Sequence, residues 1–180
     1  MGHITPQQPV KLIVGMLAGD KAFFARAEEE MRNLWGNIDV SSEVMPFTYT
    51  NYYQKEMGSP LWRKFVAFER LIDPGLLAII KQQSNELEKR YAKRNETKES
   101  DIPRSINLDP GYIDQSKLVL ASTKNYSHRI YIGDSIYAEA TLHYHKGDWQ
   151  SWPYSYPDYA CGDYSDFFNR ARKKLMEQLK

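Results

Sequence analysis

The feature that most constrains the fold is an apolar run near the start of the chain, residues 10–17 with the sequence VKLIVGML. A strand with one face in water alternates apolar and polar residues, whereas this run is apolar at almost every position and rich in β-branched side chains. Ala18, Gly19 and Asp20 end the run with turn chemistry. The run therefore predicts a central strand that is buried on both faces.

Helical spacing of apolar residues recurs in four later segments. Residues 20–36 begin with a capping aspartate and stop at a glycine. Residues 59–72 and 73–91 each open with a polar residue followed by proline, which is typical of a helix start, and each carries an apolar stripe. Residues 165–180 are amphipathic and close the chain. We therefore expect four helices.

Strand patterns occupy much of the remaining sequence. Residues 38–49 alternate irregularly around a proline, and residues 117–122, 128–132 and 136–144 have the composition of a meander of strands. Residues 94–104 are polar and lack apolar periodicity, which predicts a mobile surface loop.

The length of 180 residues, with 42% hydrophobic and 26% charged residues, suits one folded domain. Polar residues 1–9 are expected to form an N-terminal tail. The predicted fold class is α+β: a single domain over residues 1–180, with a mainly antiparallel sheet and helices packed on one face. The open face of this sheet would carry the polar side chains of the C-terminal strands.

Charge and cysteine content limit the classes of function. The 24 Lys and Arg residues nearly cancel the 23 Asp and Glu residues, so nucleic-acid binding is not expected. The single cysteine, Cys161, cannot form an internal disulfide, which favours a reducing compartment. No stretch approaches the roughly twenty apolar residues that span a bilayer, and the N-terminus lacks an apolar signal core. We expect a cytoplasmic protein with no membrane partner.

The most informative segment for function is 128–144, HRIYIGDSIYAEATLHY, where residues 133–135 supply turn chemistry between two β-rich runs. A three-residue loop would place Ile132 opposite Ile136. Each further pair in that register joins residues of like character. These pairs are Tyr131 with Tyr137, Ile130 with Ala138, and Arg129 with Glu139.

Alternation along the two strands then separates a polar face from an apolar face. One interpretation is a solvent-exposed face with a cross-strand salt bridge. The other is a ligand-binding floor, in which Arg129 offers its fork of donors to phosphate or carboxylate while Glu139 or His143 handles a proton or a metal. The polar face would hold Arg129, Tyr131, Tyr137, Glu139, Thr141 and His143, and the core face Ile130, Ile132, Ala138, Ala140 and Leu142.

Three further segments are candidates for a site. Asp109 stands before a Pro-Gly pair, which indicates either a structural turn or a positioned acid. Residues 47–58 concentrate hydroxyls, aromatic rings and one carboxylate, with Thr50, Tyr53 and Glu56 as candidate ligand contacts, although such segments also serve packing. Residues 149–159 are rich in Trp and Tyr and suit an aromatic lid or an interface.

No metal site is expected from the sequence. His143 and His145 would face the same side of a strand, with Asp148 nearby. The chain has neither an HExxH motif nor paired cysteines to complete a metal-binding set.

The combined motifs resemble the DUF4416 family (domain of unknown function 4416) of bacterial and archaeal proteins. This resemblance implies a cytoplasmic prokaryotic protein and brings no established activity or catalytic residue with it. Some relatives are labelled GTP-binding protein, but the chain has no GxxxxGKS or GxxxxGKT run and no NKxD motif, so that function is not expected. The matching segments are 10–17, 47–58, 106–113, 118–142 and 156–159.

Two functional hypotheses follow from these residues, and both leave the cofactor open. In the first, the chain binds a small anionic ligand, a nucleotide or other phosphate compound, with Arg129 as the anion anchor. If catalysis follows, Glu139, Asp109 and His143 are the first candidates for acid, base or metal ligand. In the second, the chain is a non-catalytic interaction module that forms a homo-oligomer or partner interface through its Tyr- and Trp-rich segments.

Overall fold

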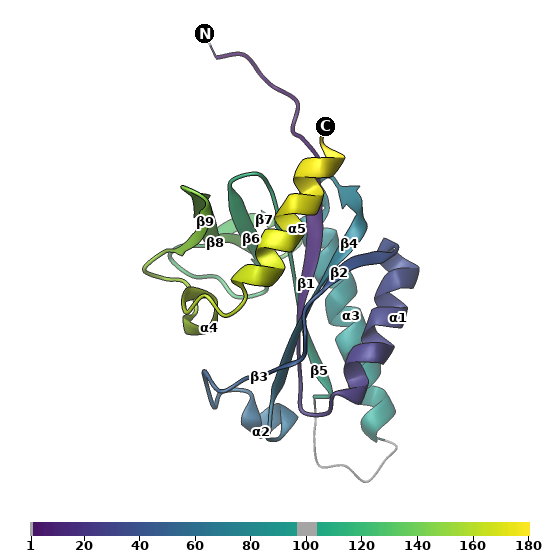
Figure 1. The fold of residues 1–180 in the computed structure, drawn as a ribbon. Coiled ribbons are helices and arrows are strands. Elements are labelled where there is room, and N and C mark those ends of the chain that lie inside the picture. The colour runs from purple at the N-terminus through teal and green to yellow at the C-terminus, as the bar shows by residue number, and fades with distance from the viewer. Residues whose placement is uncertain (1, 97–103) are drawn as a thin grey trace.

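The computed structural model describes residues 2–96 and 104–180. Within them the chain forms a 9-stranded antiparallel sheet of order β2-β4-β1-β5-β6-β8-β7, with β3 beside β4 and β9 beside β8 (Figure 1). The predicted class, a single α+β domain with a mainly antiparallel sheet, is confirmed. The strands are β1 (Val10–Ala18), β2 (Ile38–Ser41), β3 (Met45–Pro46), β4 (Trp62–Ile72), β5 (Ile106–Ile113), β6 (Lys117–Ser122), β7 (Ile130–Gly133), β8 (Ile136–His145) and β9 (Asp148–Ser151).

Strand β1 lies in the interior of this sheet, as its apolar run predicts. Every one of its residues is buried, and it pairs with β4 on one side and with β5 on the other. Side chains of alternate residues point to opposite faces, so both faces of β1 need an apolar cover.

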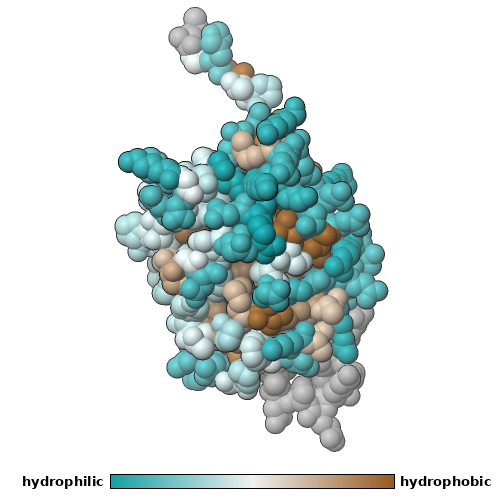
Figure 2. All heavy atoms as spheres, viewed as in Figure 1, coloured by the Kyte–Doolittle hydropathy of each residue, from teal (hydrophilic) through white to brown (hydrophobic). Residues whose placement is uncertain are grey.

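Helices supply that cover on both faces, which corrects the prediction of helices on one face only. Helices α1 and α3 pack on the side of Leu12 and Val14, whereas α5 packs on the opposite side with Ile13 (Figure 1). The outer surface over α5 is mostly hydrophilic (Figure 2). The helices are α1 (Ala22–Trp35), α2 (Gln54–Met57), the 3-10 helix η1 (Pro74–Leu76), α3 (Leu77–Glu96), α4 (Pro157–Ala160) and α5 (Ser165–Gln178).

Three of the four predicted helices are present, and the fourth is wrong. Residues 59–72 contain strand β4, which lies between β1 and β2. Val66 and Phe68 pack on the α1 and α3 side, and Phe65 and Ala67 on the α5 side. A strand that is apolar on both faces has no clear period of two, so its stripe also satisfies helical spacing.

Of the two alternatives at Asp109, the structural turn is wrong, because Asp109, Pro110 and Gly111 are part of strand β5. Pairing between β5 and β6 begins at Gly111, so Pro110 stands where that ladder ends. A Cβ at position 111 would lie 2.3 Å from the backbone oxygen of Val119. Before Gly111, β5 pairs with β1 alone, and the sheet is open between β5 and β6.

The strands of the β7–β8 hairpin pair in the predicted register, but the turn that joins them is shorter than predicted. Tyr131 lies opposite Tyr137 and Ile130 opposite Ala138, as predicted. The turn has two central residues, Asp134 and Ser135, both with positive φ, and Gly133 rather than Ile132 faces Ile136.

The prediction that Ile130 and Ile132 of β7 face the core is wrong. Ile130 is 73% exposed and Ile132 is also exposed. Strand β7 is the last strand of the sheet order, and the apolar cluster below the hairpin includes Ile136 and Ala138 of β8 but neither isoleucine of β7.

Two predicted peripheral segments complete the description. Residues 2–9 contain no helix or strand and are exposed. The predicted loop 94–104 falls mostly outside the described residues; α3 continues to Glu96, and Arg104 is half-buried. In the described part of the chain, no helix has the length and apolar composition that a membrane crossing requires.

Candidate functional site

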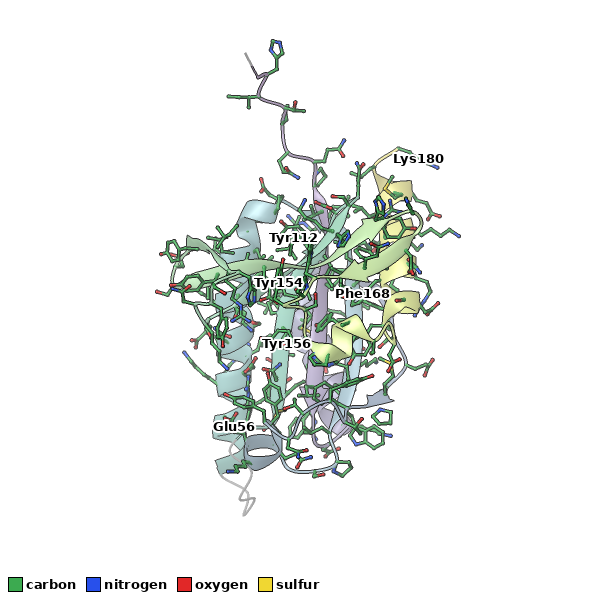
Figure 3. All side chains as sticks on the ribbon, turned by 90° about the vertical axis from the view of Figure 1, so that its left-hand side faces the viewer. Glu56, Tyr112, Tyr154, Tyr156, Phe168 and Lys180 are labelled. Carbon is green, nitrogen blue, oxygen red and sulfur yellow. The ribbon has the colours of Figure 1, made fainter. Side chains whose placement is uncertain are left out.

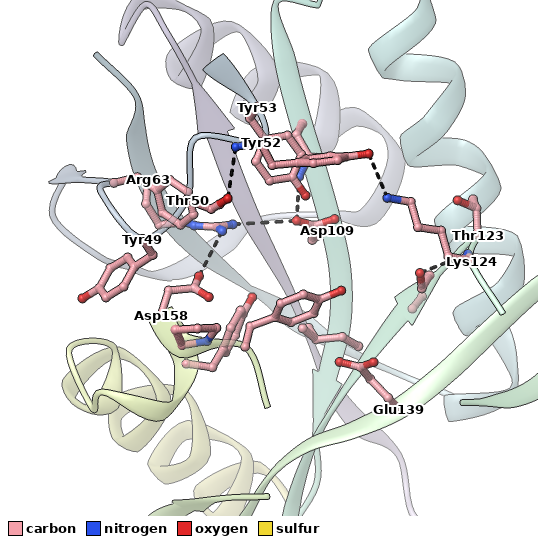
Figure 4. A pocket seen from close by; sticks show the side chains of 18 of the residues that line it. Tyr49, Thr50, Tyr52, Tyr53, Arg63, Asp109, Thr123, Lys124, Glu139 and Asp158 are labelled. Carbon is pink, nitrogen blue, oxygen red and sulfur yellow. Dashed lines mark hydrogen bonds and ion pairs between the residues drawn. The ribbon is translucent and has the colours of Figure 1, made fainter. Parts of the chain in front are cut away.

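The opening between β5 and β6 leads into a pocket with a volume of about 670 Å³. Its walls come from the loop before α2, from β4, α3, β5 and the end of β6, from the β7–β8 hairpin, and from the segment at α4 (Figure 4). Glu56 and Tyr156, which are far apart in the sequence, lie on the same side of the molecule (Figure 3). The pocket thus gathers segments from most of the chain.

Six of the ten predicted site residues line this pocket, and four do not. The lining includes the carboxylates of two separate strands, the guanidinium before β7, two residues of the loop before α2 and one residue of α2 itself. The six are Asp109, Glu139, Arg129, Thr50, Tyr53 and Glu56. The four outside are Tyr131, Tyr137, Thr141 and His143.

A β-bulge explains why His143 lies apart from Glu139. The β6–β8 register shifts between Leu118 and Val119, so that Glu139 and Leu142 pair with Leu120 and Leu118, which share one face. His143 therefore faces the other side, where its ring lies 4.4 Å from that of Trp152. Strict alternation cannot reveal such a bulge.

The other three residues, Tyr131, Tyr137 and Thr141, belong to the hairpin strands but do not line the pocket. Tyr131 and Tyr137 form a ring pair with centroids 5.6 Å apart, and Tyr131 is exposed. Thr141 is buried, and its hydroxyl donates to Glu139 Oε1 over 3.3 Å. Thr141 thus helps to fix the carboxylate of Glu139, which lines the pocket, without lining the pocket itself.

Arg129 and Glu139 point to the same side of the sheet and form a buried ion pair. Arg129 Nε donates to Glu139 Oε2 over 2.7 Å, and their side chains are 5% and 1% exposed. The other Arg129 donors reach Ser122 Oγ, the Lys124 carbonyl oxygen and the Tyr156 hydroxyl. Four of its five N–H groups are thereby used, which leaves one on Nη2.

Glu139 has a second nitrogen partner that the sequence analysis did not select. His128 Nε2 lies 3.0 Å from Glu139 Oε2, and the His128 ring stacks on Tyr154 with centroids 4.4 Å apart. Two consecutive residues just before β7, His128 and Arg129, therefore hold one carboxylate oxygen of Glu139 in place.

Arg63 of β4 lies at the floor of the pocket between two carboxylates (Figure 4). Its Nη2 is 3.1 Å from Asp158 Oδ2, and its Nη1 is 3.7 Å from Asp109 Oδ2. Its Nε and Nη1 have no hydrogen-bond acceptor among the described residues. Burial lowers the pKa of Arg63, but Tyr159 and Asp158 outweigh burial and raise it, so the guanidinium stays charged.

Side chains of α3 take the place of a neighbouring strand beside β5. Glu88 Oε1 accepts the Leu108 N–H over 2.7 Å, and Lys81 Nζ donates to the Leu108 carbonyl oxygen over 2.8 Å. Burial raises the pKa of Glu88, while Lys81 and Arg104 oppose that shift. These contacts satisfy the backbone of β5 where β6 is absent.

Arg104 ties α2 to α3 and β5. Its guanidinium contacts Glu88 at 2.5 Å and Glu56 at 3.5 Å, and it also donates to Asn107. Its backbone N–H donates to the Glu56 carbonyl oxygen. One arginine thus fixes three walls of the pocket relative to one another.

Lys124 differs from the other cations of the pocket. It is exposed, its Nζ lies 3.3 Å from the Tyr52 hydroxyl (Figure 4), and no carboxylate of a described residue lies within ion-pair distance of it. The nearby Tyr52 ring is also 60% exposed. The pKa of Tyr53 is raised to about 12, mainly because the phenol is buried and secondly because of the nearby negative charge of Asp109.

Part of the predicted Trp- and Tyr-rich surface belongs to the core. Trp149 and Tyr159 pack against the α5 side of the sheet and are buried. Trp152, Tyr154 and Tyr156 remain exposed. Among the described residues, no group of three or more His, Cys, Asp or Glu side chains is placed to hold a metal ion.

Sequence reasoning missed several residues of the pocket. Arg63 was hidden in a segment interpreted as a helix, and Lys81 and Arg104 carry no motif of their own. Asp158 lies in segment 156–159, whose most conspicuous residues are two tyrosines and a proline. The signal available for Asp158 was a carboxylate flanked by tyrosines, which is weak without the fold.

Comparisons with known proteins identify a family without an assigned activity. The family model described as "Domain of unknown function (DUF4416)" matches residues 8–175, nearly the whole chain. No curated protein and no solved structure matches. The chain belongs to the DUF4416 family.

Proposed function

We propose that the pocket binds a small anionic ligand, a nucleotide or another phosphate compound, with Lys124 as its main cationic contact. The observation that carries this proposal is the unpaired charge of Lys124 at the wall of a pocket of about 670 Å³. Small-molecule sites occupy a similar range of volumes, roughly 300–1,000 Å³.

The charge balance of the lining supports Lys124 over the other cations. Arg63 is matched by Asp109 and Asp158, Lys81 by Asp109, Arg104 by Glu56 and Glu88, and Arg129 by Glu139. A ligand anion beside any of these must compete with a carboxylate already in place. Beside Lys124 it meets no such competitor among the described residues.

Arg129 has a different part in this proposal from the anion anchor expected from the sequence. It is largely used within the protein, and one of its bonds goes to the backbone carbonyl oxygen of Lys124. Its remaining Nη2 N–H and the Lys124 ammonium group are suited to share one phosphate. Arg129 thereby supports the anchor and adds one donor.

The rest of the lining suits a ligand larger than a bare ion. Tyr52 and Tyr156 expose aromatic surface, which packs on sugars or bases at low entropic cost. If a reaction follows binding, Asp109 is more accessible than Glu139, because its side chain is 29% exposed and that of Glu139 only 1%. Cys161 is a free thiol, which supports the proposal of a reducing, cytoplasmic location.

The direct test is a binding measurement by calorimetry with pyrophosphate and a nucleoside 5′-monophosphate as probes. We expect Lys124→Met to weaken binding of both by about tenfold or more, because it removes the unpaired cation. Lys55→Met is the matched control, since it removes the same charge from an exposed residue next to Glu56 that does not line the pocket. Equal binding by the wild type and Lys124→Met, or no binding by the wild type, would contradict the proposal.

A further inference from the structure

The Asp109 carboxylate presents an unused acceptor to the pocket. Its Oδ2 accepts the Asn107 side-chain N–H over 2.6 Å. Its Oδ1 has no hydrogen bond from any described residue; the closest cation, Lys81 Nζ, stands 3.6 Å away and donates to Leu108 instead. Because Asp109 is only partly buried, Oδ1 is open to a donor from a bound molecule.

The neighbours of Asp109 show which kind of donor fits. A ligand cation at Oδ1 would stand close to the charged groups of Lys81 and Arg63, which would repel it. A neutral hydroxyl donates a hydrogen bond without adding positive charge. Asn85 and Thr123 also line the pocket, and their side chains have no hydrogen bond to another described residue, so an amide and a hydroxyl are available to the same class of partner.

We infer that the ligand is a phosphate ester of a sugar, free or within a nucleotide, whose hydroxyl donates to Asp109 Oδ1 while its phosphate meets Lys124. This inference rests on the proposed function and names its substrate class. The exposed rings of Tyr52 and Tyr156 are suited to the apolar face of a sugar or to a base. Asp109 is then the residue that distinguishes a sugar phosphate from a plain phosphate.

The experiment compares four probes of graded chemistry by calorimetry: inorganic phosphate, methyl phosphate, ribose 5-phosphate and a nucleoside 5′-monophosphate. The wild type should bind ribose 5-phosphate at least tenfold more tightly than methyl phosphate, which has the ester and no hydroxyl. A nucleoside monophosphate that binds still more tightly, with a gain lost in Tyr52→Leu, would assign the sugar to a nucleotide. Equal affinity of the two sugar-bearing probes would assign it to a free sugar phosphate.

Asp109→Asn gives the matching test on the protein side. It should lower the affinity for ribose 5-phosphate about tenfold. The affinity for inorganic phosphate should not fall, because the loss of the carboxylate frees Arg63 and Lys81 from a competing anion. Asp166→Asn, on the exposed side of α5, is the control. If Asp109→Asn does not fold, the comparison of methyl phosphate with ribose 5-phosphate still decides the question.

The outcomes separate this inference from the proposed function. Equal binding of methyl phosphate and ribose 5-phosphate by the wild type, with a loss of both in Lys124→Met, would overturn the sugar ester and leave the anion site standing. Failure of every phosphate probe to bind would remove both.

Discussion

Arg129 and Glu139 illustrate what single residues of a sequence can and cannot reveal. Their pairing follows from the hairpin register, in which each residue meets one of like or complementary character, and the ion pair is present at 2.7 Å. Their near-complete burial does not follow from that register. It depends on Tyr156 and on the end of β6, which lie far away in the sequence.

The burial of this pair leads to a prediction about stability. Arg129→Met leaves Glu139 buried without its main partner, so the free energy of unfolding should fall by roughly 3–5 kcal/mol. Glu139→Gln should also destabilise the protein, and the double variant should lose less than the sum of the two single variants. Urea unfolding of the three variants measures these differences.

An exposed ion pair provides the control for that cycle. Lys89 and Glu86 approach to 2.6 Å on α3, with both side chains 66% exposed, so Lys89→Met should change stability by less than about 1 kcal/mol. Additive effects of Arg129→Met and Glu139→Gln would show that the two side chains do not depend on each other.

At the scale of elements, the strongest and weakest predictions have the same physical origin. Burial on both faces identified β1 correctly because its run is short and followed by a turn. The same property in β4 imitated a helix, because a longer strand with apolar residues on both faces also fills a helical stripe. Strand β5 was missed because Pro110 and Gly111 are turn residues in most contexts. Here Pro110 stands just outside the β5–β6 ladder, and Gly111 opens that ladder where the neighbouring backbone comes very close.

The candidate site was predictable only where one element carried its residues. The hairpin gave Arg129 and Glu139, and the segment 47–58 gave Thr50, Tyr53 and Glu56. Arg63 and Lys81 come from elements whose contribution depends on the sheet topology. Sequence patterns within one element carry no information about which distant element faces it.

Gly111 allows a test of the close approach between β5 and β6. In Gly111→Ala the new Cβ would meet the Val119 backbone oxygen at 2.3 Å, and a backbone atom cannot turn aside as a side chain can. We expect a loss of about 3 kcal/mol or more, measured by urea unfolding. Gly2→Ala, where nothing lies within 4 Å, is the control. Unchanged stability of Gly111→Ala would mean that the strands separate at little cost.

At the scale of the whole molecule, the phenols buried on the α5 side of the sheet and at the pocket predict a loss of stability in alkali. Burial raises the pKa of Tyr53, Tyr159 and Tyr164 above the ordinary value of about 10. Above pH 10 the unfolded chain loses these protons while the folded chain keeps them. Their stabilising contribution is thus complete below pH 10 and is lost as the pH rises further.

Each such phenol should contribute a slope of about 1.4 kcal/mol per pH unit above pH 10. Tyr159→Phe should reduce the slope by that amount, and it should cost little at neutral pH because the Tyr159 hydroxyl has no hydrogen-bond partner among the described residues. Urea unfolding between pH 9 and 11.5 measures the slope, with the exposed Tyr131→Phe as control. A Tyr159→Phe slope equal to that of the wild type would contradict the argument.

The replacement of a strand by side chains of α3 has a consequence for how the cavity can change. Lys81 and Glu88 bond the carbonyl oxygen and the N–H of Leu108, which β6 would need in order to pair with this part of β5. The β5–β6 ladder therefore cannot extend past Gly111 and close the pocket. The depth of the chamber is therefore set by rigid architecture. A change of ligand specificity would therefore come from the entrance, where exposed residues such as Tyr52 and Lys124 can be substituted without disturbing the pocket walls.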